Sequence, residues 1–251
     1  MDQAHLLLGA GLAAGAMNAL AGGGSFVTLP AFIVAGVPSV SANASSTVAL
    51  YPGGLASAWV YRAGLAGVCG VPLKPTLAVT LLGGFLGALL LLLLWTPNAA
   101  FDQVLPWLLL LATLTLAAGP RLARFVHMRF RGGLPFVLFV QLLLGIYGGY
   151  FGGAVGLIMM AAWSLLGNAD LKALNPPRTL LVSAANTVAV VCFALAGAVD
   201  WVAATLVAGG ALLGGYSGAH LGKRLPSSLV RAATLLVVTA MTIAFFLRAY
   251  G

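Results

Sequence analysis

The fold is decided by the stretch Gly9-Ala-Gly-Leu-Ala-Ala-Gly-Ala-Met-Asn-Ala-Leu-Ala-Gly-Gly-Gly-Ser-Phe-Val-Thr-Leu-Pro30, which places three consecutive glycines in an otherwise apolar run. Each glycine costs a helix interior about 1 kcal/mol relative to alanine. Inside a membrane, non-helical backbone persists only where protein or a water-filled cavity satisfies its polar groups. Small residues also allow close helix packing, but three glycines followed by Ser25 and Pro30 favour a break in the helix at a binding site.

The composition predicts a helical membrane protein. Hydrophobic residues make up 61% of the chain, charged residues only 6%, and the mean hydropathy is +1.08. The net charge of +8 does not indicate nucleic-acid binding, because the basic residues lie between apolar runs, as in cytoplasmic loops. Cys69 and Cys192 show no metal or redox spacing and are interpreted as small hydrophobic residues. We expect no cofactor and no metal.

Eight apolar segments follow one another along the chain. Six have the length of about 20 residues that crosses a bilayer, whereas the first and fifth are too long for a simple crossing. Each long segment is expected to be either one tilted or kinked helix, or a re-entrant hairpin of two half-helices. The segments span residues 6–36, 42–60, 76–95, 104–126, 134–167, 178–198, 201–221 and 229–250.

An internal repeat divides the chain into two units, 1–131 and 132–251, which together form one transmembrane domain. Each unit contains one long glycine-rich segment followed by three ordinary ones. Three matches in the same order carry this alignment: Gly15 and Gly22 with Gly149 and Gly156, Asn43-x-x-x-Thr47 with Asn175-x-x-x-Thr179, and Gly83-Gly-Phe-Leu-Gly87 with Gly214-Gly-Tyr-Ser-Gly218.

The distribution of basic residues predicts the topology. If all eight segments crossed the membrane, seven Lys and Arg residues would lie inside and five outside. If the fifth segment is a hairpin that returns to the cytoplasm, every basic residue except Arg248 lies inside, as the positive-inside rule requires. The expected fold is therefore all-α, with two inverted repeats of one re-entrant hairpin and three crossings each, in the cell (inner) membrane.

The glycine cluster followed by Leu29-Pro30, together with Ala42-Asn43-Ala-Ser-Ser-Thr47, resembles the sulfite exporter TauE/SafE family. The likeness covers most of the chain. In the second half the cluster reads Gly152-Gly-Ala-Val-Gly156, without the triple glycine and the serine. The resemblance implies a transporter of small sulfur-containing or organic anions, such as sulfite, thiosulfate, sulfoacetate or related organosulfonates, which most members move outward.

The candidate substrate site consists of groups that bind an oxyanion without a carboxylate. Half-helix ends offer free N–H groups and a positive dipole, hydroxyl and amide groups add neutral donors, and a guanidinium fits a sulfonate. For the two asparagines helix capping is an equal alternative, and for the arginine a role as topology anchor is an alternative. The expected site residues are Gly22, Gly23, Gly24, Ser25, Asn43, Ser46, Thr47, Asn175, Arg178 and Thr179.

The scarcity of carboxylates limits how transport could be coupled to an ion gradient. The sequence has no Glu, and its four Asp fall in predicted loops or near the N-terminus, so no intramembrane carboxylate is available as a proton or cation site. Export of an anion needs none, because a negative-inside potential supplies about 2.3 kcal/mol per charge per 100 mV. The sequence therefore favours export driven by the membrane potential, with uptake coupled to an ion as the alternative.

Two alternatives to transport are an intramembrane protease and a scaffold subunit. Gly215-Tyr-Ser-Gly218 matches the Gly-x-Ser-Gly pattern of rhomboid intramembrane proteases, but the nearby His220 lies on the same helix, without the reach that a serine–histidine pair requires. A subunit that only scaffolds partners gives no reason for paired glycine breaks. We therefore expect no enzyme activity and no nucleic-acid partner. The expected partners are a small anion and the bilayer, and the glycine-rich faces near Gly83 and Gly214 leave a homodimer open.

Overall fold

The computed structural model describes residues 3–94, 98–126, 133–166 and 171–251. These residues form an all-helical bundle, as predicted, and the part of the chain described holds no strand beyond an isolated bridge between Val68 and Val71. The elements are α1 (Gln3–Leu20), α2 (Ser25–Val34), α3 (Ser39–Tyr61), the short 3₁₀ helix η1 (Arg62–Gly64), α4 (Leu73–Leu94), α5 (Asn98–Val126), α6 (Leu134–Phe151), α7 (Val155–Leu166), α8 (Leu171–Leu195), α9 (Trp201–Arg224) and α10 (Ser227–Tyr250).

Within the described residues, six helices are long and apolar enough to cross a membrane: α4, α5, α6, α8, α9 and α10. Five of them match crossings expected from the sequence. The expected crossing 42–60 lies in α3, which at 23 residues is about 34 Å long but carries Ser, Asn and Thr that lower its hydropathy. The sixth span is instead α6, which the sequence assigned to half of a hairpin.

Both long apolar segments break into two helices. The first breaks after α1, where Gly22 adopts a φ of +87°, and the second breaks after α6, where Gly152 adopts a φ of +65°. A left-handed residue directly after a helix is the common way to end it, and glycine adopts that conformation without a Cβ clash. The second helix of each pair is short, at ten residues for α2 and twelve for α7.

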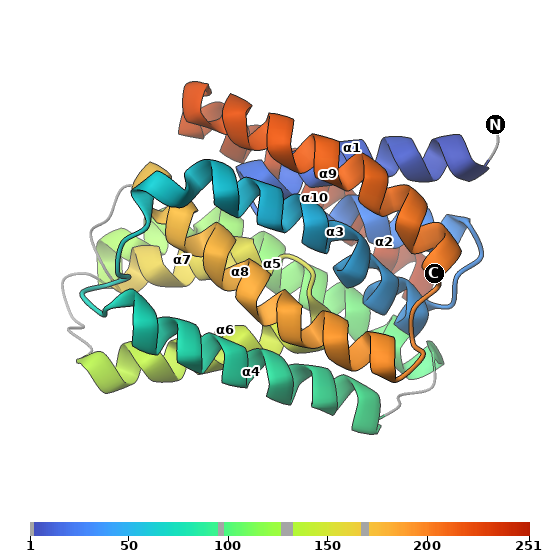
Figure 1. Ribbon diagram of the computed structural model, residues 1–251, viewed down its shortest axis with the longest axis horizontal. Helices are drawn as coiled ribbons and strands as arrows, with labels where there is room; N and C mark the ends of the chain where they lie inside the picture. Colours follow the sequence, from blue (N-terminus) through green and yellow to red (C-terminus); the bar gives the residue numbers. More distant parts are fainter. Residues whose placement is uncertain (1–2, 95–97, 127–132, 167–170) are drawn as a thin grey trace.

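The helix pairings in the two halves correspond. Figure 1 shows α1 beside α9 along one edge of the bundle and α4 beside α6 along the other, with α3 and α8 between them. Glycines allow the backbones of these outer pairs to touch, since a Cβ on Gly214 would lie 2.1 Å from the Leu12 carbonyl oxygen and one on Gly83 would lie 2.6 Å from that of Leu142. These glycine faces pack against helices of the same chain, so they are not available as a dimer surface. The homodimer itself stays a prediction.

The contacts change the register of the sequence alignment. Leu12 and Ala16 meet Gly214 and Gly218, and Leu142 and Ile146 meet Gly83 and Gly87 in the same way. The residues of α1 and α6 that make these equivalent contacts are 130 residues apart, whereas the sequence matches of Gly15 with Gly149 and of Gly22 with Gly156 are 134 apart, a difference of about one helical turn. Glycines recur every four residues in this region, so a shift of one turn still aligns glycine with glycine. Gly22 and Gly152, which are also 130 residues apart, both have positive φ.

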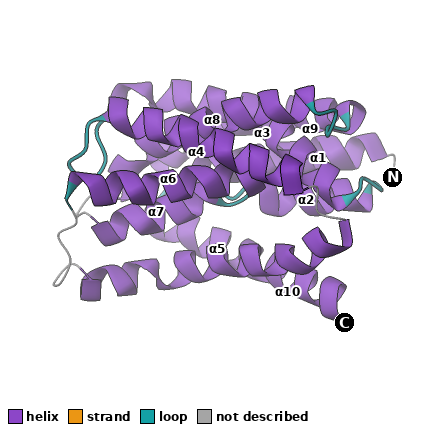
Figure 2. Ribbon diagram, turned by 90° about the horizontal axis from the view of Figure 1, so that it is seen from below, coloured by secondary structure: helices purple, strands orange, loops and turns teal. Residues whose placement is uncertain are grey.

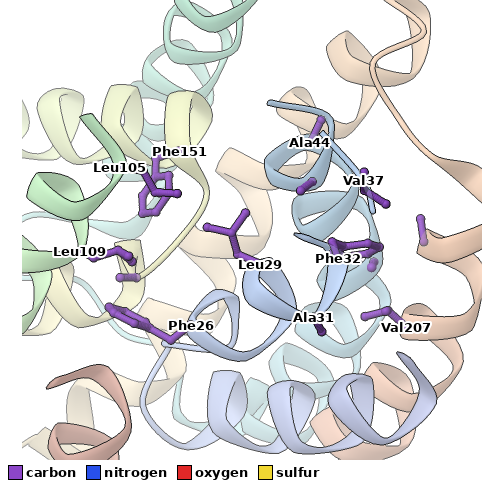
Figure 3. Close-up of a cluster of buried hydrophobic side chains, with 14 of the residues drawn as sticks. Phe26, Leu29, Ala31, Phe32, Val37, Ala44, Leu105, Leu109, Phe151 and Val207 are labelled. Atoms are coloured by element: carbon purple, nitrogen blue, oxygen red, sulfur yellow. The ribbon is translucent and has the colours of Figure 1, made fainter. Parts of the chain in front are cut away.

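The helices α2 and α7 lie inside the bundle, which is what brings the breaks to its interior. Figure 3 shows Phe26 and Leu29 of α2 pointing toward Leu105, Leu109 and Phe151, while Phe32 lies near Val207 of α9. Figure 2 shows α5 and α10 side by side along one flank. Ten residues of helix measure about 15 Å, so α2 covers only about half of a bilayer core of about 30 Å.

Candidate functional site

The two breaks meet each other in the interior. A Cβ atom built on Gly22 would lie 2.7 Å from the Cα of Gly156, and one built on Gly156 would lie 2.9 Å from the Cα of Gly22. Gly22 ends the first hairpin's long arm, and Gly156 lies in the first turn of α7. Only residues without a side chain allow this approach, which joins the two hairpins at one point.

Arg178 of α8 reaches this meeting point and is buried there, with 1% of its surface exposed. Its Nη2 donates a hydrogen bond of 2.7 Å to the carbonyl oxygen of Ala19, near the end of α1. Its Nη1 would lie 2.6 Å from a Cβ on Gly22 and 3.4 Å from one on Gly156. The guanidinium therefore stands between the two breaks, unlike an exposed topology anchor.

Two of the nitrogens of Arg178 have no hydrogen-bond partner among the described residues. Nε and Nη1 are both buried and unpaired. The ion pair that the structure describes, between Arg248 and Asp102 at 4.0 Å, lies at a partly exposed position elsewhere. A buried cation without a counter-charge costs several kcal/mol, and an anion placed against Nη1, the nitrogen nearest Gly22 and Gly156, would offset that cost.

A small cavity of about 10 Å³ adjoins the guanidinium, which is room for about one water molecule. Two further buried polar atoms without a partner, Ser183 Oγ and Asn186 Oδ1, belong to residues of its wall. The lining residues are Asn18, Gly22, Tyr51, Gly54, Ser57, Arg178, Thr179, Val182, Ser183 and Asn186.

Three of the expected site residues line this cavity: Gly22, Arg178 and Thr179. The Thr179 hydroxyl donates to the carbonyl oxygens of its own helix, at Asn175 and Pro176. Gly23, Gly24 and Ser25 are buried at the same break but do not line the cavity. Gly23 instead packs near Met17 and Leu157, Gly24 packs against Ala14 and Asn18, and Ser25 begins α2.

Asn43 and Thr47 lie at the second break instead, whereas Ser46 contacts α2. Asn43 Nδ2 donates to the carbonyl oxygen of Tyr150, near the end of α6, at 3.2 Å. Thr47 stands against Gly152, where a Cβ would lie 2.3 Å from Thr47 Oγ1, and its hydroxyl donates to Asn43. The hydroxyls of Ser46 and Thr28 are hydrogen-bonded to each other.

The sequence left helix capping open for the two asparagines, but neither lies at the N-cap of its own helix. The residue before α3 is Pro38, and Asn43 lies five residues into the helix. Asn175 likewise lies inside α8. Asn43 therefore does not cap its own helix but satisfies a terminal carbonyl of α6, as Arg178 does for α1. A side chain near the start of α3 thus bonds to the end of α6, and one near the start of α8 bonds to the end of α1.

Asn175 lies apart from Arg178's cavity. It lines two larger cavities, of about 80 Å³ and about 270 Å³, at the end of the bundle where α3 and α9 end and α8 and α10 begin. We call this end the basic end, because Arg62, Lys223, Arg224 and Arg231 lie there.

The sequence reasoning missed the polar wall formed by α8. Thr179, Ser183 and Asn186 follow one another at spacings of four and three residues, so they lie on one helix face. That spacing in an apolar segment was the available signal. Tyr51 and Ser57 come from α3, and no spacing in the sequence links them to α8.

The chain thus has a helix break in each half and a buried arginine between the breaks. Residues 7–245 match the family described as sulfite exporter TauE/SafE. The chain belongs to the TauE/SafE family. It is therefore a multi-pass membrane transporter and not an enzyme. No solved structure gives a significant match.

Three TauE/SafE relatives match nearly the full chain. The probable membrane transporter protein YfcA of Escherichia coli K12 is 29% identical over 242 residues, covering 95% of this chain and 87% of the relative. A probable membrane transporter protein of Haemophilus influenzae is 28% identical, with coverages of 96% and 94%. The probable membrane transporter protein ORF9 of Sinorhizobium is 28% identical, with coverages of 92% and 87%.

The protease alternative also fails on geometry. Ser217 Oγ donates to the carbonyl oxygen of Leu213, and His220 Nδ1 contacts that of Tyr216, so both side chains bond to their own helix. Neither is arranged as a nucleophile and base facing a substrate.

Proposed function

We propose that this transporter carries a small sulfur-containing oxyanion, such as sulfite, thiosulfate, sulfoacetate or a related organosulfonate, out of the cell, and that Arg178 binds it. The observation that carries the proposal is the pair of buried donors, Arg178 Nε and Nη1, that lack a partner in the described residues. Nη1, which faces Gly22 and Gly156, can donate a charge-assisted hydrogen bond to an oxygen of a sulfonate. Residues at the same cavity, Ser183 and Asn186, complete the site with neutral groups.

The proposed architecture is a pair of inverted repeats, 1–131 and 132–251, each with a re-entrant hairpin and three crossings. Two sets of helix contacts support it. The packing of α1 on α9 in one half matches the packing of α6 on α4 in the other. The packing of α3 on α9 likewise matches that of α8 on α4. The matching left-handed glycines, Gly22 and Gly152, are also in support. Such repeats place a transport site between the two halves.

Transport in this scheme requires the hairpins to separate. The cavity beside Arg178 holds about one water molecule, which is too small for a sulfonate, so the structure corresponds to an occluded state. Movement of Gly22 away from Gly156 would enlarge the space directly in front of Arg178 Nη1. The expected site residues Gly23, Gly24 and Ser25 would then add backbone N–H groups from the start of α2. Asn43 and Thr47 would hold the second break, and Ser46 would hold α2 through Thr28.

Export driven by the membrane potential is the proposed direction. Of the acidic residues with described side chains, Asp102 pairs with Arg248 and Asp200 caps α9 through Ala203 N. Neither lies beside Arg178, so the described residues offer no carboxylate for ion coupling at the site. Uptake coupled to an ion remains the alternative, and the direction of potential-driven flux separates the two.

The test is flux of radiolabelled sulfite and of ethanesulfonate from proteoliposomes under an imposed potential. Wild type is compared with Arg178→Gln, Arg178→Ala and Asn43→Ala, and Arg248→Gln is the matched control, since it removes a cation far from the cavity. Potential-driven flux that is lost in the Arg178 variants and kept in Arg248→Gln supports the proposal. Absence of flux for both anions in folded wild type would overturn the substrate assignment.

A further inference from the structure

We propose that the cavity at the basic end is a second anion-binding site, formed by Tyr61, Asn175 and Lys223, at which the substrate binds before it reaches Arg178. This inference rests on the proposed function. The cavity measures about 270 Å³ and is lined by Val60, Tyr61, Ala63, Gly64, Asn175, Pro176, Gly222 and Lys223. It is many times larger than the space beside Arg178.

Two buried polar atoms of this cavity's residues lack a hydrogen-bond partner among the described residues. They are the Tyr61 hydroxyl, on a side chain only 7% exposed, and Asn175 Oδ1. An unpaired buried polar group costs about 1–3 kcal/mol. A bound oxyanion would accept from the Tyr61 hydroxyl, and the Asn175 amide could turn its Nδ2 toward the same ligand.

Positive charge is supplied by Lys223. Its Nζ donates to the Val60 carbonyl oxygen at 2.9 Å and lies 5.8 Å from the centre of the Tyr61 ring, so the ammonium is held at the cavity wall. The neighbouring cavity, which shares Asn175 and Gly222, adds Arg231, whose Nη2 donates to the carbonyl oxygens of Leu116 and Ala117. No carboxylate belongs to the described lining of either cavity, so both favour an anion.

The cavity leads toward Arg178 along α8. Asn175 and Pro176, which line the cavity, lie within one helical turn of Arg178. A Cβ on Gly222 would lie 2.5 Å from the Tyr61 hydroxyl oxygen, so this hydroxyl packs against the α9 backbone at the cavity wall. Tyr61 is thus placed to bind an anion in the cavity, and α8 connects that cavity to Arg178.

The opposite end of the bundle is tied together differently. Ser41 Oγ donates to the Ala198 carbonyl oxygen, and the Asp200 backbone N–H donates to Ser45 Oγ, which joins α3 to the start of α9. Access from the basic end, predicted to be cytoplasmic, agrees with an exporter that collects its substrate inside the cell.

The experiment measures anion binding in this cavity without transport. A cysteine is introduced as Ala63→Cys in a chain carrying Cys69→Ser and Cys192→Ala, and its modification is timed with the anionic sulfonatoethyl methanethiosulfonate reagent and with its cationic trimethylammonioethyl counterpart. In the full-length protein we expect faster reaction with the anionic reagent and protection by ethanesulfonate. Lys223→Gln should lower the anionic-to-cationic rate ratio about 10-fold, whereas the control Arg248→Gln should leave it unchanged.

Flux supplies the second readout. Lys223→Gln and the conservative Tyr61→Phe should raise KM about 5-fold, the value of one hydrogen bond of about 1 kcal/mol, with the maximal rate retained. A rate ratio that does not respond to Lys223→Gln, or a cysteine that ethanesulfonate does not protect, would overturn the second site even if Arg178-dependent flux persists. Protection in a protein that shows no flux would uphold the second site and overturn the proposed function.

Discussion

The first and second breaks have the same backbone but different partners. After α1 and after α6 the chain turns on a left-handed glycine, Gly22 or Gly152. The end of α1 is held by the charged Arg178 and the end of α6 by the neutral Asn43. In the proposed function the single cation Arg178 binds one anion, so this difference between the two breaks would set the charge of the substrate.

Removal of the charge at the first break should have the largest effect on transport. Arg178→Gln keeps hydrogen-bonding capacity but loses the cation, and we expect the flux of sulfite to fall at least about 100-fold, because hydrogen bonds to charged groups contribute about 1.5–3 kcal/mol each. Arg178→Lys should restore part of the rate, since a point charge remains without the planar fork. Proteoliposome flux checks this, and equal loss in Arg248→Gln would show that the effect is not specific to the site.

The two left-handed glycines should differ in their tolerance of a methyl group. Gly22→Ala places a Cβ against the backbone of Gly156 and should lower the free energy of unfolding by about 3 kcal/mol. Gly152→Ala meets only the Thr47 hydroxyl, so the double variant with Thr47→Ala should recover to the strain of about 1 kcal/mol of a left-handed residue. Thermal unfolding in detergent measures this.

A double variant at the second break that is no more stable than Gly152→Ala alone would contradict this comparison. It would mean that Thr47 is not the group that limits the space around Gly152. Equal losses for Gly22→Ala and for the double variant of Gly152→Ala with Thr47→Ala would show that the two breaks tolerate a methyl group equally.

Loss of the neutral Asn43 at the second break should reduce transport less than loss of the charged Arg178 at the first break. Asn43→Ala removes the hydrogen bond to the Tyr150 carbonyl oxygen, so we expect a loss of stability of about 1 kcal/mol and a flux reduced about 5-fold. Asn43→Gln, with the same amide on a longer side chain, is the matched control. A loss of flux as large as that of Arg178→Gln would place the anion at the second break.

The smallest effects are expected from the polar wall of the cavity. Ser183→Ala and Asn186→Ala each remove one neutral group that lacks a partner in the described structure, so folding should change little. KM for the anion should rise about 3-fold in each, less than one full hydrogen bond of about 1 kcal/mol. Val182→Ala, at the same wall without a polar atom, is the control, and an equal rise there would indicate a change of shape.

Several features of the site were predictable because they depend on local chemistry. Three consecutive glycines broke the first segment where expected, and Arg178, Gly22 and Thr179 share a cavity. Asn175 and Asn43 were predicted beside them, but Asn175 lines a different cavity and Asn43 reaches the other hairpin. Spacing along a helix defines a face, whereas the partner of that face depends on how distant helices pack.

The sequence by itself determined the class of protein, the all-helical fold and the positions of both breaks, because apolar composition and glycine act on the chain locally. Only the tertiary structure decided the register of 130 residues, the contact of Gly22 with Gly156 and the unpaired burial of Arg178. These features depend on side chains more than 100 residues apart meeting in one interior, and only the packing of the two halves brings them together.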